Sequence, residues 1–285
     1  MTGNRKSVAV AAAASESRPA CRKLEPQFHR KIWGTDRLDP WFTCERGENV
    51  GEVWYPSGDL LIKFLFTSAD LSIQVHPDEE YARERGEPHG KTEMWHVLRA
   101  DPGARIALGF ARSYSASEIA EAAQTGAIMQ MLNWIEVQKG DTYFVPAGIV
   151  HAIGAGLAIC EIQQNSDITY RLYDYGRERE LHLDLAREVM RTDVCNETTR
   201  TSDGDGMKLL VECPYFRTHL VNTGECGWLP GSSHLLVVLA GTGRVNGVSA
   251  YSGCVLEDIG YQGWFLEPER NDSTEGFTLL LVDAR

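Results

Sequence analysis

Short stretches of alternating apolar and polar residues, separated by Gly, Pro and Asp, recur along the chain from residue 24 onward. This pattern is typical of antiparallel strands in a sandwich or barrel. Strands are therefore predicted at 60–67, 71–76, 91–98, 105–109, 141–145 and 157–163, and again at 209–211, 216–221, 235–239, 253–257 and 277–282.

Three stretches interrupt the strand pattern and predict helices. Residues 78–87 follow a proline and begin with an acid, as a helix N-terminus prefers. Residues 115–131 open with Ser115 and Glu118 at the spacing of a capping box, and their apolar residues recur at helical spacing. A third helix is expected at 183–190. The fold class is thus mainly β with a few helices.

Residues 196–206 are polar and rich in Thr, Asp and Gly, which predicts a linker. It would join a larger β domain at 24–195 to a smaller one at 207–285. Residues 1–23 carry little apolar area to offset the entropy cost of ordering, so they are expected to form a disordered tail that is dispensable for activity. The Ala-rich run in this tail is too short and too weakly apolar to favour a secretion signal.

Composition excludes several classes of protein. The longest strongly apolar run, 235–240, is far shorter than the roughly 20 residues that span a bilayer, which argues against a membrane protein. The net charge of −12 argues against a general nucleic-acid binder and means that an anionic substrate needs a local positive pocket. Seven cysteines without a Cys-x-x-Cys pair suit a reducing compartment, so a cytoplasmic protein is expected.

The most specific local pattern runs from Gly140 to His151. Gly140, Pro146, Gly148 and His151 have the spacing of the second sequence motif of cupin β-barrels, which this stretch resembles. In such a motif a strand ends at the proline, the second glycine permits a tight turn, and the histidine points into the barrel mouth. The cupin pattern usually has Asn where this chain has Ala155. An ordinary turn beside a buried histidine is the alternative.

Polar side chains also share faces of two predicted strands. Ser72, Gln74 and His76 alternate with apolar residues, and Lys91 and Glu93 lie on one face of the next strand. A carboxylate, an amide oxygen and two imidazoles form a plausible ligand set for a divalent metal such as zinc, which would be held by Gln74, His76, Glu93 and His151. The alternative is a solvated sheet face with a surface Lys–Glu pair.

A third polar group follows at 161–174, with Glu161 and Arg171. Arginine supplies an always-charged fork suited to phosphate or an enediolate oxygen. The alternative for Arg171 is a surface ion pair with Asp167 or Asp174.

The stretch from residue 32 to residue 187 resembles the short bacterial form of type I mannose-6-phosphate isomerases. The resemblance rests on the motifs at 71–78, 90–95, 145–151 and 160–171. It implies a cupin jelly-roll barrel with one zinc ion per chain, bound by the residues matching Gln74, His76, Glu93 and His151. It also implies that Arg171 is an active-site arginine, that Ser72 and Lys91 line the sugar-phosphate pocket, and that Glu161 matches an active-site acid.

The reaction implied is the interconversion of mannose 6-phosphate and fructose 6-phosphate through an enediol. It needs an electrophile at the carbonyl and a base near the C2 proton. Glu161, Lys91 and a metal-bound water remain alternative bases, so Arg171, Glu161 and Lys91 are the candidate catalytic residues, and Ser72, Lys91 and Arg171 the candidate substrate contacts. Two other functions are considered, a ferrous cupin dioxygenase and a non-catalytic sugar-binding cupin.

The region from residue 207 onward suggests a reduced second cupin barrel. Its histidines, His219 and His234, lack acid or Gln partners at ligand spacing, so a barrel without a metal site is expected. The sequence does not predict an oligomeric state.

Overall fold

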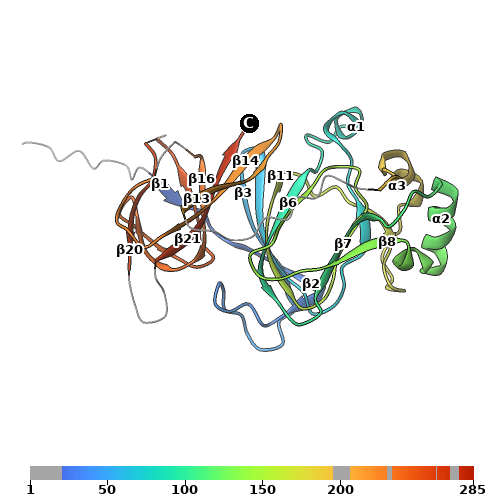
Figure 1. Cartoon of the computed structure of the whole chain (residues 1–285), viewed down its shortest axis with the longest axis horizontal. Coiled ribbons are helices and arrows are strands. Elements are labelled where there is room, and N and C mark those ends of the chain that lie inside the picture. Colours follow the sequence, from blue (N-terminus) through green and yellow to red (C-terminus); the bar gives the residue numbers. More distant parts are fainter. Residues whose placement is uncertain (1–20, 195–205, 230–232, 261, 270–275) are drawn as a thin grey trace, which may run out of the picture.

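Two β units lie side by side in the computed structural model of the chain, which describes residues 21–194, 206–229, 233–260, 262–269 and 276–285. Figure 1 shows the C-terminal unit, coloured orange to red, against one side of the N-terminal unit, whose helices lie at the opposite end. The prediction of a mainly β, cupin-like fold with few helices is confirmed.

Two antiparallel sheets form the N-terminal unit. The six-stranded sheet has the order β2(Gln27–Thr35), β3(Val50–Ser57), β4(Leu60–Phe66), β11(Leu157–Gln164), β6(Glu93–Ala100), β9(Thr142–Val145). The five-stranded sheet has the order β12(Tyr170–Tyr173), β5(Ile73–Val75), β10(His151–Ile153), β7(Arg105–Phe110), β8(Leu132–Glu136). Trp95 and Leu65 of the first sheet share a buried cluster with Leu108 of the second, so the inner faces pack on one another.

Helices cover the outer face of the five-stranded sheet. Ile119 of α2(Ala116–Thr125) and Ala186 of α3(Leu183–Val189) are buried with Phe110 of the sheet. The predicted capping box of Ser115 is confirmed, but α2 ends at Gly126 (φ 80°) and a 3₁₀ turn, η1(Ala127–Gln130), follows it. A further short helix, α1(Glu79–Glu84), follows β5. None of the described helices is long and apolar enough to cross a membrane.

The C-terminal unit is also built of two antiparallel sheets. The six-stranded sheet has the order β1(Cys21–Lys23), β19(Val255–Asp258), β16(Leu235–Ala240), β21(Phe277–Ala284), β14(Phe216–Thr223), β13(Gly206–Glu212). The four-stranded sheet has the order β15(Gly227–Trp228), β20(Phe265–Pro268), β17(Thr242–Val245), β18(Val248–Tyr251).

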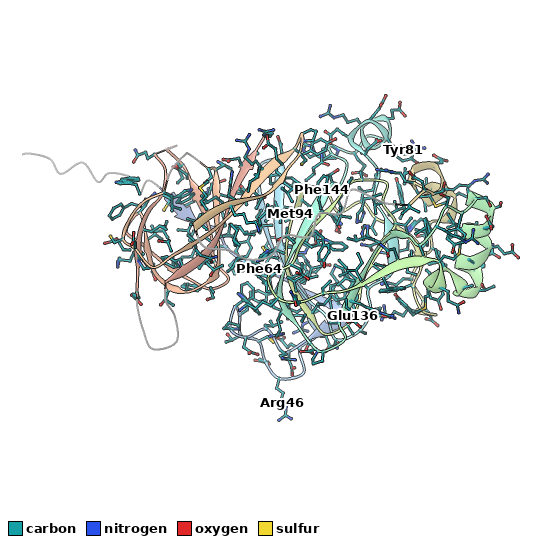
Figure 2. All side chains as sticks on the ribbon, viewed as in Figure 1. Arg46, Phe64, Tyr81, Met94, Glu136 and Phe144 are labelled. Atoms are coloured by element: carbon teal, nitrogen blue, oxygen red, sulfur yellow. The ribbon has the colours of Figure 1, made fainter. Side chains whose placement is uncertain are left out.

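One hydrophobic core joins the two units. Phe64 and Met94 of the N-terminal unit are buried in the same cluster as Val237 and Leu280 of the C-terminal unit (Figure 2). Strand β16 is apolar on both faces, since its odd-numbered residues from Leu235 enter this shared core while Leu236 and Val238 face the core within the C-terminal unit. The apolar run at 235–240 is thus a strand buried on both sides.

Residues 21–23 differ from the prediction. Residues 21–23, assigned to the disordered tail, form β1, which pairs with β19, and Cys21 is fully buried. The amino-acid composition of the tail did not reveal this strand, because β1 pairs with β19 through backbone hydrogen bonds. Residues 1–20 lie outside the described residues, as does the predicted linker 196–206 except for Gly206, which begins β13.

Candidate metal centre

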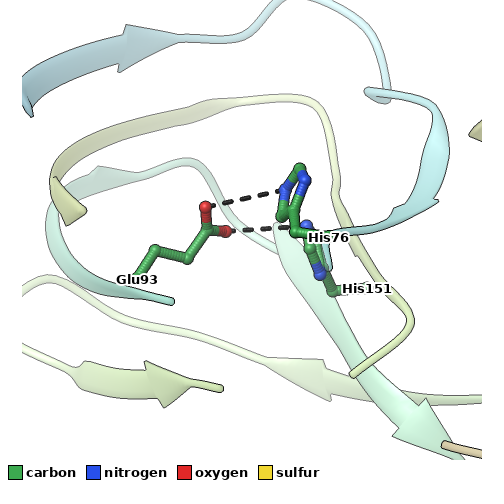
Figure 3. Close-up of side chains that lie close together, drawn as sticks. All are labelled: His76, Glu93 and His151. Atoms are coloured by element: carbon green, nitrogen blue, oxygen red, sulfur yellow. Dashed lines mark ion pairs between the residues drawn. The ribbon is translucent and has the colours of Figure 1, made fainter. Parts of the chain in front are cut away.

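Three buried side chains, His76, Glu93 and His151, converge between the two sheets of the N-terminal unit (Figure 3). Their nearest ligand atoms all lie within 4.8 Å of one another. His76 follows β5 and His151 begins β10 in one sheet, whereas Glu93 begins β6 in the other. The turn before His151 is the predicted one: Gly148 has φ 85° and donates its N–H to the carbonyl of His76 at 2.8 Å.

The two imidazoles are oriented by backbone carbonyls. Nδ1 of His76 donates to the carbonyl of Ile168 at 2.7 Å, and Nδ1 of His151 donates to that of Ile149 at 2.9 Å. Nε2 of each ring is therefore the acceptor, and the two lie 3.7 and 3.5 Å from oxygens of Glu93. Burial, followed by the charge of Lys91, lowers the pKa of His76 well below its usual value, and burial lowers the pKa of His151 to about 4. Both rings are neutral at pH 7, the form that binds metals.

Glu93 presents a carboxylate oxygen that lacks a hydrogen bond. Oε1 accepts from the indole of Trp95 at 3.1 Å. The buried Oε2 makes no hydrogen bond in the described part of the chain but forms an ion pair with the ammonium of Lys91 at 3.1 Å. A carboxylate oxygen and two imidazole nitrogens are a donor set for a divalent cation, and N and O donors suit zinc.

Gln74 and Ser72 complete the predicted group. Gln74 pairs with His151 in the β5–β10 register, and its Nε2 lies 3.3 Å from Nε2 of His151. Ser72 donates to Oε1 of Gln74 at 3.1 Å. The four predicted ligands are therefore neighbours, with Ser72 beside them.

Lys91 and Glu161 lie against this cluster. Nζ of Lys91 is 2.9 Å from Nε2 of His76, 3.1 Å from Oε2 of Glu93 and 3.9 Å from Oε1 of Glu161. Lys91 and Glu93 are buried, so the alternative of a surface Lys–Glu pair is wrong. Burial acts to lower the pKa of Lys91, but the charges of Glu93 and Glu161 outweigh it and raise this pKa. Burial, together with the charge of Glu93, raises the pKa of Glu161 to about 8.

A cavity rich in charged residues opens over Lys91, Glu93 and Glu161. Most of its cations are paired with acids: Lys31 with Glu52, Lys63 with Asp167, Lys91 with Glu93, and Arg179 with Asp174.

Arg171 differs from the other cations of the cavity. It pairs with Gln74 in the β12–β5 register, and its guanidinium makes no ion pair with an acid in the described part of the chain. Its Nη1 donates only to the carbonyl of Glu180, at 3.4 Å, and its buried Nε has no hydrogen-bond partner there. The alternative of an ion pair with Asp167 or Asp174 is therefore wrong.

Several cavity residues were missed by the sequence reasoning. Lys63 is a lone charge in an otherwise apolar strand, a signal that could have found it. Lys31 and Glu52 lie in β2 and β3, two strands that the pattern did not predict.

Comparison with known proteins gives consistent results. A mannose-6-phosphate isomerase of Streptococcus mutans is 34% identical over 279 residues, which cover 80% of this chain and 88% of the relative. A probable mannose-6-phosphate isomerase of Bacillus subtilis is 33% identical over 279 residues, 79% of this chain and 88% of the relative. No family model matches the sequence.

Solved structures share the fold. The crystal structure of the mannose 6-phosphate isomerase from Bacillus subtilis superposes with a TM-score of 0.72 at 23% identity, covering 92% of this chain and 99% of that one. A zinc-bound mannose 6-phosphate isomerase superposes with a TM-score of 0.70 at 13% identity, covering 93% and 100%. About a third of the residues are identical between this chain and each of the two relatives, over most of the length of both. This chain therefore belongs to the mannose-6-phosphate isomerase family.

Proposed function

We propose that the protein is a zinc-dependent aldose–ketose isomerase that interconverts mannose 6-phosphate and fructose 6-phosphate. The observation that carries the proposal is the buried group of His76, Glu93 and His151, of which Glu93 lines a cation-lined cavity, in a chain of this family. Its substrate is a sugar phosphate.

Gln74, His76, Glu93 and His151 would hold one zinc ion. The amide of Gln74, whose nitrogen faces His151 in this structure, would turn to present its oxygen. When bound, the metal polarises the sugar carbonyl and stabilises negative charge on its oxygen. The neutral imidazoles and the buried carboxylate of Glu93 beside them support this ligand set.

Glu161 and Lys91 are the candidates for the proton chemistry. A base takes the proton from C2 and returns it to C1, and it works best with a pKa near the working pH. The pKa of Glu161, raised to about 8, supports Glu161 in this role. Lys91 keeps its charge and would donate hydrogen bonds to the sugar oxygens that become negative in the enediolate.

Arg171 is the proposed anchor of the phosphate group, because its guanidinium makes no ion pair among the described residues. Phosphate binding at a distance from the reacting carbons orients the sugar. Ser72 is proposed to contact the substrate beside Gln74.

A coupled assay of purified, zinc-loaded protein tests the function in both directions. Conversion of mannose 6-phosphate to fructose 6-phosphate is expected, with loss of activity after chelation and recovery on adding zinc. A zinc-loaded protein that converts neither sugar phosphate would overturn the proposal. Metal-dependent oxygen consumption would favour the dioxygenase, and sugar binding without turnover the non-catalytic cupin.

We also propose that the reaction takes place in the cytoplasm. The six cysteines in the described part of the chain are all free, as in a reducing compartment. Fractionation of the native cells tests this location. Detection of the chain outside the cytoplasmic fraction would contradict it.

A further inference from the structure

Three chain segments deliver groups to the metal centre, and hydrogen bonds connect them to one another. The N–H of Lys91 donates to the carbonyl of Pro77 at 3.0 Å, which joins the segment of Lys91 to that of His76. The N–H of Ala147 donates to the hydroxyl of Thr92 at 3.3 Å, which joins the segment of Lys91 to the turn before His151. The segment 90–92 therefore lies between the segments that carry the two histidines.

Two side chains outside the cavity hold this segment at both ends. Gln164, buried at the end of β11, accepts from the N–H of Thr92 at 3.0 Å and donates to Oε2 of Glu79 at 2.6 Å. The same oxygen of Glu79 accepts from the N–H of Gly90 at 3.0 Å. Glu79 and Gln164 thus fix the backbone on either side of Lys91, directly before Glu93.

The backbone at Gly90 packs so closely against the start of α1 that it cannot move toward this helix. A Cβ at Gly90 would lie 2.4 Å from the carbonyl carbon of Asp78 and 2.6 Å from the nitrogen of Glu79. Burial acts to raise the pKa of Glu79, but its hydrogen bonds from Gly90 and Gln164, with the charge of Arg83, lower it overall. The acceptor is therefore a carboxylate, whose hydrogen bonds are stronger than those of a neutral group.

We propose that Glu79 and Gln164 are positioning residues that set Lys91 and Glu93 against the two histidines of the metal centre. Neither lines the cavity, so they act through the segment that they hold. The catalytic part of this inference rests on the proposed isomerase function, whereas the part that concerns metal affinity does not.

The decisive variant is Gln164→Glu, because it keeps an acceptor for Thr92 and replaces the bond to Glu79 with repulsion between two carboxylates. Loss of such supporting contacts lowers metal affinity or activity by about 10–100-fold. Zinc affinity, measured by competition with a chromophoric chelator, and kcat should fall by this factor, with KM nearly unchanged. The double variant Glu79→Gln/Gln164→Glu restores the hydrogen bond between the two side chains but not the one from the N–H of Gly90, so it should recover only part of both.

Arg83→Gln is the matched control. Arg83 contacts the other oxygen of Glu79 at 2.6 Å and is exposed, so its replacement should leave zinc affinity and kcat as in the wild type. A Gln164→Glu protein with wild-type melting temperature, zinc affinity and kcat would overturn the inference, as would a double variant that recovers no part of the loss. If the wild type itself has no isomerase activity, the proposed function fails, and the zinc affinities still decide the positioning role.

Discussion

The ammonium of Lys91 donates to Nε2 of His76 across 2.9 Å, and this nitrogen is the one that a metal-binding imidazole offers. Lys91 and a metal ion therefore compete for the same lone pair, and their positive charges repel one another. This position supports the proposed role of Lys91 at the reacting carbons.

Replacing Lys91 by Met should separate metal binding from catalysis. Without the ammonium, zinc affinity should be unchanged or higher, whereas kcat should fall by about 10²–10⁴-fold, as for other groups that assist proton transfer. Competition with a chromophoric chelator measures the zinc affinity, and steady-state kinetics measure kcat. Lys139→Met, which replaces an exposed lysine, is the control. Loss of zinc from the Lys91 variant would show that the lysine supports the metal site.

Arg171→Ala should impair recognition of the phosphate. A hydrogen bond to a charged group contributes about 1.5–3 kcal/mol, so kcat/KM for mannose 6-phosphate should fall about 10–100-fold at full zinc content. The fall should be smaller for unphosphorylated mannose. Equal losses on both sugars would place Arg171 at the reacting carbons instead. The exposed Arg85→Ala, which removes an ion pair with Glu188, is the control.

His151→Ala and His76→Ala should remove zinc and activity together, because each removes one of the two imidazoles of the cluster. Elemental analysis of purified variants measures the metal. His219→Ala, which changes a histidine of the C-terminal unit, should keep both. Full zinc occupancy in either cluster variant would refute the ligand assignment.

Glu161 should make the stability of the metal-free protein depend on pH. Its pKa is about 8 in the folded chain against an ordinary value of 4.5, so the folded state keeps a proton that the unfolded chain loses. The resulting stabilisation is complete below about pH 4.5 and is lost as the pH rises to about 8. The melting temperature of the wild type should therefore fall relative to that of Glu161→Gln between about pH 5 and pH 8. A difference between the two proteins that is constant with pH would contradict the raised pKa.

A chain that begins at Leu24 should be less stable than one that begins at Cys21. The shorter chain lacks β1, the burial of Cys21, and the ion pair of Arg22 with Glu257. Each kcal/mol lost lowers the melting temperature of a protein of this size by about 2–4 °C. Equal melting temperatures would show that β1 contributes nothing to stability, as the sequence alone suggested.

The strands that the pattern predicted are those with a regular apolar face. Residues 60–66 form β4 because every side chain of that strand is buried. By contrast, β2 was missed because most of its residues, from Gln27 to Ile32, are exposed or half-buried and show no apolar alternation. Short strands such as β17 and β18 give too few residues for a period to appear.

The grouping of the proposed ligands was predictable because each lies in a short motif with a characteristic spacing. Gln74 lies in β5, His76 directly follows it, and His151 follows a specific turn. The pairing of cations in the cavity was not predictable, since Lys63 and Asp167 meet only when distant parts of the chain come together. That meeting is what leaves Arg171 without an acidic partner among the described residues.

Strand β1 is synthesised well before its partner β19, since 235 residues separate Arg22 from Glu257, which pair across the two strands. The ribosome releases the chain from its N-terminus, so the sheets of the N-terminal unit can assemble while β19 is still untranslated. Until then the backbone groups of β1 have no partner strand, and an unpaired edge invites association with other chains. Protection of β1, and with it completion of the C-terminal sheet, therefore waits for the synthesis of β19.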